Sequence, residues 1–217
     1  MIRSVLIMLV FTIGLAGCTF DYTLLLSAVR PLQNSIGIVD GIPAFTNRCT
    51  ASLINTERRL WLTAAHCLAH VPGQPVAPPA LFIAGQLAEP VLVHVGLDLA
   101  VLSTTDPIDA TALRLASHAP AAGDWVGTAG YPLGIGHVFV FAGTAAAPVV
   151  SIPRYPPFAF FGLITAPGQS GSPIVNQQGA LVSIMLQSVA KDPVFDPIVV
   201  GATWESLKTV VGQFWEE

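Results

Sequence analysis

One serine of the chain stands in a stretch that could carry nucleophilic chemistry. Ser170 lies between two glycines in GQSGSP, residues 168–173. Glycine tolerates backbone angles that other residues avoid and proline fixes its own, so this stretch predicts a sharp turn. The flanking residues 160–165 and 174–175 are apolar and β-prone, which places the turn between strands. Taken alone, Ser170 is either a nucleophile held on a tight turn or an ordinary loop serine.

A serine hydroxyl is a weak nucleophile until a base takes its proton, and the base must itself be oriented. Of the five histidines, only His66 has a context that fixes it, near the end of the apolar stretch WLTAAHC, residues 61–67. Asp98 begins the apolar stretch DLAVL, residues 98–102. A carboxylate at such an edge is costly to bury unless a donor pairs with it, and a histidine N–H is a suitable donor. His66 and Asp98 are therefore the candidate base and orienting acid.

The motifs LTAAHC, DLAVL and GQSGSP, in this order, resemble those of the chymotrypsin-like serine peptidase family. His66 and Asp98 are 32 residues apart (66 to 98), and Asp98 and Ser170 are 72 apart (98 to 170). The resemblance covers about residues 35–214. It implies that His66 is the general base and then the acid, that Asp98 holds its tautomer, and that Ser170 attacks the carbonyl carbon.

The same resemblance implies that the backbone N–H groups of Gly168 and Ser170 form an oxyanion hole. One position departs from the mammalian digestive enzymes, because Gln169 stands where they have an aspartate that pairs with a new N-terminus after cleavage. That mode of activation is not expected here. The turn and GYPLG, residues 130–134, look more like the compact bacterial and viral branch. This branch includes the glutamyl endopeptidases and the high-temperature-requirement proteases.

The specificity pocket of this family is walled by the residues before the oxyanion turn and by the strand after the serine. The resemblance therefore assigns Ile164, Thr165 and Ala166 to one wall, and Met185 to Ser188 to the other. These segments hold no aspartate that would select lysine or arginine, and no histidine of the kind that glutamyl endopeptidases use. We expect a small or apolar residue before the scissile bond.

The first residues are typical of an export signal. Arg3 supplies a positive charge, residues 5–14 form the apolar core, and small residues follow. LAGC, residues 15–18, resembles the lipobox of bacterial lipoproteins, whose cysteine is lipidated and becomes the mature N-terminus. This implies an exported protein anchored to a membrane of the cell envelope through Cys18, on the periplasmic side or at the cell surface. In a Gram-negative host, Thr19 favours the outer membrane. An ordinary signal peptide with a nearby cysteine is the alternative.

The three cysteines fit this interpretation. With Cys18 taken by lipid, Cys49 and Cys67 remain as an even pair in a chain exported to a disulfide-permissive compartment. Two buried free thiols are the alternative. In the chymotrypsin-like family, a cysteine just before a strand such as TASLI pairs with the cysteine after the histidine, which implies a Cys49–Cys67 disulfide.

The composition and the pattern of apolar residues predict the elements that position these groups. Charged residues make up only 10% of the 217, the net charge is −4, and no basic patch exists, which excludes nucleic-acid binding. Thirteen short apolar and β-branched stretches with turn residues between them predict an all-β sandwich or barrel. They are 36–39, 52–54, 60–62, 81–84, 91–95, 99–102, 125–129, 138–142, 148–152, 158–163, 174–175, 181–186 and 198–200. The family resemblance implies two six-stranded antiparallel barrels.

The expected domains follow from these patterns. A signal peptide covers residues 1–17, the lipidated cysteine and a linker cover 18–34, and the peptidase domain covers 35–217. Within it we expect a first barrel over about 35–105, a crossing over about 103–123, a second barrel over about 124–201 and a C-terminal helix over about 203–215. The helix is indicated by apolar residues at helical spacing from Trp204 to Phe214, with Thr203 as its cap.

Other kinds of site and function were weighed against this interpretation. His66 and His70 are four residues apart, but no glutamate follows the first, so neither a metal site nor a cofactor is expected. His94, near Asp98, is expected to be an ordinary strand residue. The sequence lacks both the strand–helix alternation and the Gly-x-Ser-x-Gly elbow of the α/β-hydrolases, which argues against an esterase. The main alternative is a protease-like lipoprotein that binds peptides without cutting them. The expected partners are a polypeptide substrate and a membrane.

Overall fold

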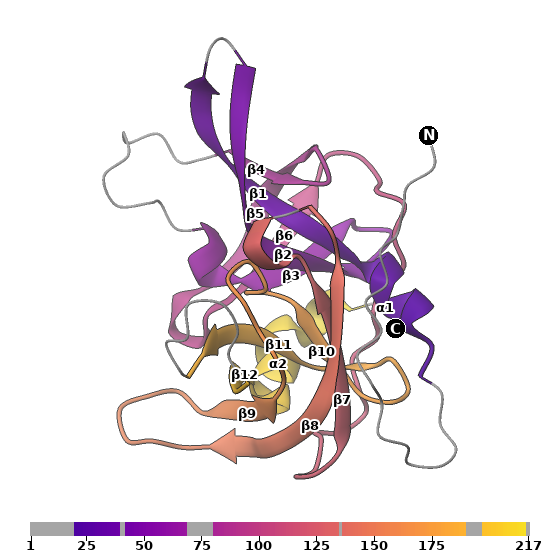
Figure 1. Ribbon diagram of the computed structural model, residues 1–217, viewed down its shortest axis with the longest axis vertical. Coiled ribbons are helices and arrows are strands. Elements are labelled where there is room, and N and C mark those ends of the chain that lie inside the picture. Colours follow the sequence, from indigo (N-terminus) through magenta and orange to yellow (C-terminus); the bar gives the residue numbers. More distant parts are fainter. Residues whose placement is uncertain (1–19, 40–41, 69–79, 135, 190–196, 216–217) are drawn as a thin grey trace.

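The computed structural model describes residues 20–39, 42–68, 80–134, 136–189 and 197–215. Their strands form two closed barrels, with strand orders β1-β2-β3-β6-β5-β4 and β10-β11-β12-β9-β8-β7. All strand pairs are antiparallel. Figure 1 shows the first barrel, β1 to β6, above the second, β7 to β12. The expected all-β architecture of two six-stranded antiparallel barrels is confirmed.

The strands of the first barrel are β1 (Val29–Val39), β2 (Ile42–Asn55), β3 (Leu60–Ala64), β4 (Leu81–Ile83), β5 (Gln86–His94) and β6 (Leu99–Thr104). Those of the second are β7 (Trp125–Gly130), β8 (Phe139–Val150), β9 (Phe158–Gly162), β10 (Pro173–Val175), β11 (Leu181–Ser188) and β12 (Val199–Ala202). The α-helices are α1 (Tyr22–Ala28) and α2 (Trp204–Val211). The short 3-10 helices among the described residues are η1 (Ala65–Leu68), η2 (Val95–Leu97), η3 (Pro132–Gly134) and η4 (Gly212–Phe214).

One strand unites two of the apolar stretches that were expected to be separate. Residues 138–142 and 148–152 fall largely within β8, which pairs through its first half with β7 and through its second half with β9. Pro148 cannot donate to a strand ladder. The pairing of β8 with β9 contains register shifts around Ala147, so the long strand bends there and continues past the proline.

The expectation that residues 18–34 form a linker is wrong for their described part, residues 20–34, because this part is folded. Helix α1 begins after Asp21, whose carboxylate accepts a hydrogen bond from Thr23 N at 2.8 Å. The hydrogen bonds of Thr23 hold the pKa of Asp21 below its usual value. Leu25, Ala28 and Val29 are buried, and burial of these apolar side chains is the physical reason the segment is ordered. Strand β1 therefore begins at Val29, before the expected boundary.

The predicted signal peptide and the lipidation site Cys18 lie outside the described residues. Within the described part of the chain, no helix is both long and apolar enough to cross a membrane. The first described residue, Phe20, lies against Trp125 of β7, with ring centroids 4.8 Å apart.

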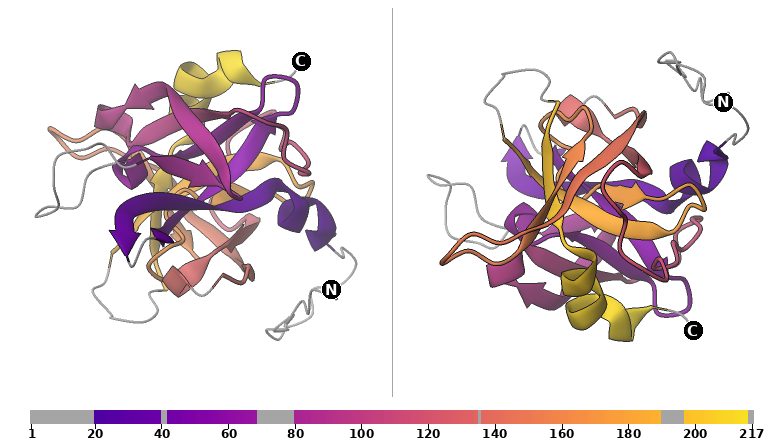
Figure 2. Two further views of the ribbon diagram at one scale, coloured as in Figure 1. Left: turned by 90° about the horizontal axis from the view of Figure 1, so that it is seen from above. Right: turned by 90° about the horizontal axis from the view of Figure 1, so that it is seen from below.

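In the part of the chain that the structure describes, three groups of buried side chains make up the core. One fills the first barrel around Trp61, and a second fills the second barrel around Phe161. The third spans both barrels and both α-helices, and it includes Leu25 of α1 and Leu207 of α2. Thr203 caps α2 by accepting from Ser206 N at 3.1 Å. Figure 2 shows α2 at the periphery beside the first barrel, so both ends of the described chain cover the junction of the barrels.

Candidate active site

His66 and Asp98 are brought together by two neighbouring strands of the first barrel. β3 ends just before His66, β6 begins just after Asp98, and the register pairs Ala64 with Leu99. The His66 Nδ1 lies 2.7 Å from Asp98 Oδ2, and the backbone N–H of His66 donates to Asp98 Oδ1 at 2.7 Å. The carboxylate therefore fixes both the ring and the backbone of the same residue. When Nδ1 carries the proton donated to Asp98, Nε2 is left as an acceptor.

The loop before Asp98 adopts a conformation that the sequence did not reveal. Asp98 has a left-handed backbone (φ 55°), which aspartate tolerates better than most residues. The preceding η2 is capped by His94, whose Nδ1 accepts from Leu97 N at 3.1 Å. His94 is thus more than the ordinary strand residue expected from the sequence, because its side chain holds the turn that presents Asp98.

The turn around Ser170 is shaped by two left-handed glycines. Gly168 has φ +99° and Gly171 has φ +81°. A Cβ at Gly168 would lie 2.5 Å from Tyr131 O, and one at Gly171 would lie 2.3 Å from Thr50 O, so neither position has room for a side chain. The sequence prediction of a sharp turn at GQSGSP is therefore confirmed in detail.

Gln169 supports this turn from inside. Its side chain is fully buried, and its Oε1 accepts a hydrogen bond from Ala166 N at 2.9 Å. Its own N–H donates to Ala166 O at 3.2 Å, and its carbonyl accepts from Ser172 N at 2.9 Å. The neutral carboxamide of Gln169 therefore stabilises this turn by a local hydrogen bond, at the position where the digestive enzymes have a charged aspartate.

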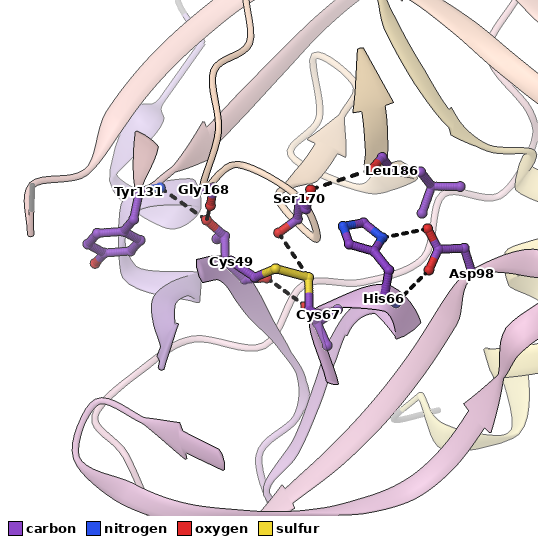
Figure 3. Close-up of a disulfide and its surroundings, with 10 residues drawn as sticks. Cys49, His66, Cys67, Asp98, Tyr131, Gly168, Ser170 and Leu186 are labelled. Carbon is purple, nitrogen blue, oxygen red and sulfur yellow. Dashed lines mark hydrogen bonds and ion pairs between the residues drawn. A yellow bond between two sulfur atoms is a disulfide. The ribbon is translucent and has the colours of Figure 1, made fainter. Parts of the chain in front are cut away.

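Ser170 faces His66 across the junction of the barrels. Figure 3 shows the imidazole between Asp98 and Ser170, with its second nitrogen on the side of the serine. The Ser170 hydroxyl donates to Leu186 O at 3.4 Å, a long contact, and is not hydrogen-bonded to His66. Within the described residues, the backbone N–H groups of Gly168 and Ser170 have no hydrogen-bond partner. The turn thus presents two free N–H donors beside a serine hydroxyl.

The disulfide implied by the family resemblance is present. Cys49 in β2 is bonded to Cys67 in η1, with the two Cα atoms 6.0 Å apart, which excludes the alternative of free thiols. Both cysteines are buried, and Cys67 directly follows His66. The two sulfur atoms and His66 lie within 4.8 Å of one another, but sulfurs joined in a disulfide are not available as thiolate ligands for a metal.

Four of the residues expected to wall the specificity pocket, Ile164, Thr165, Met185 and Ser188, have different environments. Thr165 and Met185 come from the two expected walls and are in contact, with Thr165 Oγ1 3.2 Å from Met185 Sδ. Both are buried, and Met185 belongs to the core of the second barrel. Ile164 is 41% exposed, and Ser188 is exposed at the end of β11. The assignment of these four residues to a substrate pocket remains a prediction.

A cavity of about 210 Å³ adjoins the site at Asp98. It lies between η2, the β8–β9 loop, β11, β12 and α2, and it is lined by Leu186 and Gln187 of the expected second wall but not by Ile164, Thr165, Met185 or Ser188. Its walls include Leu97, Asp98, Tyr155, Leu186 and Ser206. These residues come from separate segments of the chain, so no local motif could have grouped them.

Comparisons with known proteins agree with this geometry. The model of the trypsin-like peptidase domain family matches residues 49–184, which is more than half of the chain. The chain therefore belongs to the trypsin-like peptidase family, and this membership supports a serine protease. No curated protein matches the chain significantly.

Solved structures give the same fold. The HtrA-type protease AlgW, solved with a decapeptide, is similar with a TM-score of 0.69 and 18% identity, over 87% of this chain and 65% of that one. A form of AlgW with a tripeptide has a TM-score of 0.67 and 20% identity, over 88% of this chain and 63% of that one. A mutant of Rv3671c from M. tuberculosis H37Rv, in an inactive form, has a TM-score of 0.66 and 15% identity, over 93% of this chain and 96% of that one. The chain thus spans less than two thirds of the length of the AlgW structures. These likenesses confirm the chymotrypsin-like fold.

Proposed function

We propose that the protein is an extracytoplasmic serine endopeptidase that uses Ser170, His66 and Asp98 as a catalytic triad. The observation that carries the proposal is the pairing of one carboxylate with both the ring and the backbone of His66, opposite a serine on a turn with two free N–H donors. Membership of the trypsin-like family supports the same reaction class. A peptide-binding module without activity would not require this combination.

The reaction follows from these groups. His66 Nε2 takes the proton of Ser170 as its oxygen attacks the carbonyl carbon of the scissile peptide, while Asp98 stabilises the resulting imidazolium. The oxyanion accepts hydrogen bonds from the N–H groups of Gly168 and Ser170, each worth roughly 3 kcal/mol in the transition state. His66 then donates its proton to the leaving amine, and an acyl-enzyme on Ser170 remains. Water, deprotonated by His66, hydrolyses the acyl-enzyme and restores the serine.

The resting position of the Ser170 hydroxyl requires one movement before this reaction. Its present acceptor is Leu186 O, so the side chain must turn toward His66. The hydrogen bond that it gives up is long and correspondingly weak. Catalytic hydrogen bonds are often loose in free enzymes and tighten when substrate binds.

For the substrate, we propose a small or apolar residue before the scissile bond. The residues assigned to the two pocket walls carry no charge that could neutralise a lysine, arginine or glutamate side chain. A peptide-library profile should therefore favour alanine, valine or larger apolar residues at that position. A profile dominated by arginine, lysine or glutamate would refute this specificity.

For the location, we propose attachment to a membrane of the cell envelope through lipid on Cys18. A multiply acylated terminus binds a membrane stably, as a single chain does not. Since Phe20 already packs on Trp125, such an anchor would hold the barrels close to the membrane surface. Cys18→Ala should move the protein from the membrane fraction to the soluble fraction. Equal membrane attachment of the variant would contradict lipidation.

The reaction is tested by exposing the full chain to a fluorophosphonate probe, followed by mapping of the labelled peptide. We expect one adduct on Ser170, lost in Ser170→Ala. Ser172→Ala is the matched control, because this second serine of the same turn is fully buried. No adduct on a folded, disulfide-bonded sample would favour the peptide-binding alternative.

A further inference from the structure

The two free N–H groups of the turn owe their direction to the carbonyl groups that precede them. In a planar trans peptide, the C=O of one residue and the N–H of the next point in opposite directions. The carbonyl before Gly168 N–H belongs to Pro167 and accepts from Leu133 N. The carbonyl before Ser170 N–H belongs to Gln169 and accepts from Ser172 N at 2.9 Å. Each donor is therefore aimed by the hydrogen bond on the other side of its peptide.

The remaining carbonyls of the turn are held by a single residue of the first barrel. Thr50 N donates to Ser170 O at 2.8 Å, and Thr50 Oγ1 donates to Gly168 O at 3.2 Å. These bonds hold the Gly168–Gln169 and Ser170–Gly171 peptide groups. The peptide group between them, Gln169–Ser170, carries the Ser170 N–H. With the two bonds above, all four successive peptides from Pro167 to Gly171 are fixed through their carbonyls.

The same hydroxyl also holds the loop that aims the other donor. Thr50 Oγ1 accepts from Tyr131 N at 3.0 Å, at the start of the loop that contains Leu133. The hydroxyl thus uses both its proton and a lone pair, and it joins β2, the loop after β7 and the Ser170 turn. Leu133 has a left-handed backbone (φ 57°), and its side chain is 46% exposed, so packing of that side chain contributes little to its position.

Thr50 is itself rigidly placed. It is fully buried, follows the disulfide-bonded Cys49, and its carbonyl accepts from Thr63 Oγ1 at 2.9 Å. A buried hydroxyl does not need such partners in this core, because the hydroxyls of Ser52 and Thr128 are also buried and have none within the described residues. The two hydrogen bonds of the Thr50 hydroxyl are therefore a specific arrangement of this position.

We propose that Thr50 is a positioning residue whose hydroxyl carries the geometry of the first barrel to the oxyanion donors of the second. The catalytic part of this inference rests on the function proposed above. Thr50 does not touch the substrate. It acts through Gly168 O and the loop at Tyr131, and it places the two N–H groups where charge develops in the transition state.

The test compares three variants of the full chain. Thr50→Val keeps the shape of the side chain and removes the hydroxyl, Thr50→Ser keeps the hydroxyl, and Thr128→Val makes the same change at a buried threonine without hydrogen-bond partners. Two kinds of measurement are made: steady-state kinetics on a peptide substrate, which give kcat and KM, and hydrogen exchange of the peptides that cover residues 128–134 and 166–172.

We expect Thr50→Val to lower kcat by roughly 10- to 100-fold with little change in KM, because a small displacement of the donors affects the transition state and not the ground state. Hydrogen exchange should become faster in both segments. Thr50→Ser should restore both quantities, and Thr128→Val should leave both unchanged. Wild-type kcat in Thr50→Val, or a loss equal to that of Thr128→Val, would overturn the proposal.

Hydrogen exchange separates this inference from the proposed function. If the wild-type protein cleaves no peptide and forms no adduct on Ser170, the proposed function fails. Faster exchange in Thr50→Val alone would still support the link from Thr50 to the turn, and unchanged exchange would overturn it. If Thr50→Val does not fold, Thr50→Ala replaces it, since water can enter the vacated space and pair with the two backbone groups.

Discussion

The two barrels support their parts of the site by different physical means. In the first barrel, His66 and Asp98 are held by strand register, by two hydrogen bonds between them and by a disulfide next to the histidine. In the described part of the second barrel, no disulfide supports the Ser170 turn. Its shape depends on left-handed glycines, the buried Gln169 and hydrogen bonds that reach it from other segments.

This difference predicts which perturbations should affect each half of the site. The first barrel presents side chains whose ionisation and pairing matter, so changes of charge, redox state and pH should act there. The second barrel presents backbone groups whose direction matters, so added Cβ atoms and lost carbonyl partners should act there. Each of the following experiments tests one side of this contrast.

The largest effect is expected from the charge of Asp98. Asp98→Asn should lower kcat by about four orders of magnitude, because the amide stabilises the wrong tautomer of His66 and no longer stabilises its charged form. Steady-state kinetics on a peptide substrate measure this, with circular dichroism to confirm the fold. Asp124→Asn is the control, since that carboxylate also accepts a backbone hydrogen bond, from Ala121 N, in an exposed loop. Turnover at the wild-type rate would remove Asp98 from the triad.

A smaller but still large effect is expected from a Cβ at Gly168. Gly168→Ala places that atom 2.5 Å from Tyr131 O, which must displace the turn, and we expect kcat to fall by roughly 100- to 1,000-fold, as on loss of one oxyanion donor. Gly123→Ala is a matched control, because Gly123 has a similar φ of +91° and nothing within 4 Å of the added atom. Equal losses of kcat in both variants would show that backbone strain, not the oxyanion turn, is responsible.

The disulfide should affect stability more than it affects the Ser170 turn. Its sequence separation is 18 residues, and closing a loop of that size is worth about 3 kcal/mol of unfolding free energy in the chain-entropy model. Denaturant unfolding of Cys49→Ser/Cys67→Ser should show this loss, and hydrogen exchange should rise mainly in β2 and η1. Faster exchange confined to the second barrel would contradict the contrast between the two halves.

The gentlest perturbation is acidification. His66 must be neutral to accept the Ser170 proton, so activity should rise with pH as the imidazole loses its proton and fall by about tenfold per unit on the acid side. The turn residues Gln169 and Ser170 do not titrate between pH 5 and 8, so they contribute nothing to this dependence. A flat pH–rate profile from pH 5 to 8 would argue against His66 as the base.

The parts of the site that the sequence predicted lie in local motifs. His66, Asp98 and Ser170 each stand in a short stretch whose residue types suit one strand end or one turn, and their order matched a known family. The contacts of Thr50, Leu133 and His94 were not predicted. Thr50 reaches across 118 residues to Gly168, and no pattern within either segment records such a hydrogen bond.

The fold shows the same distinction between local and distant information. Apolar stretches located most strands, because each strand buries its own side chains. They did not show that β8 continues through Pro148, since this depends on its partner changing from β7 to β9. They also missed α1, whose apolar residues are ordered by side chains distant in the sequence.

The position of α1 has a consequence for the order in which the protein is made. The helix leaves the ribosome early, yet its buried Leu25 packs in the same cluster as Leu181, Leu207 and Phe214, which are synthesised last. Contacts of such long sequence separation form slowly, because a large loop must close before they are gained. The apolar face of α1 can therefore be covered only after the second barrel and α2 have been synthesised. A pause in synthesis before residue 181 should leave this face uncovered and open to chaperones or proteases.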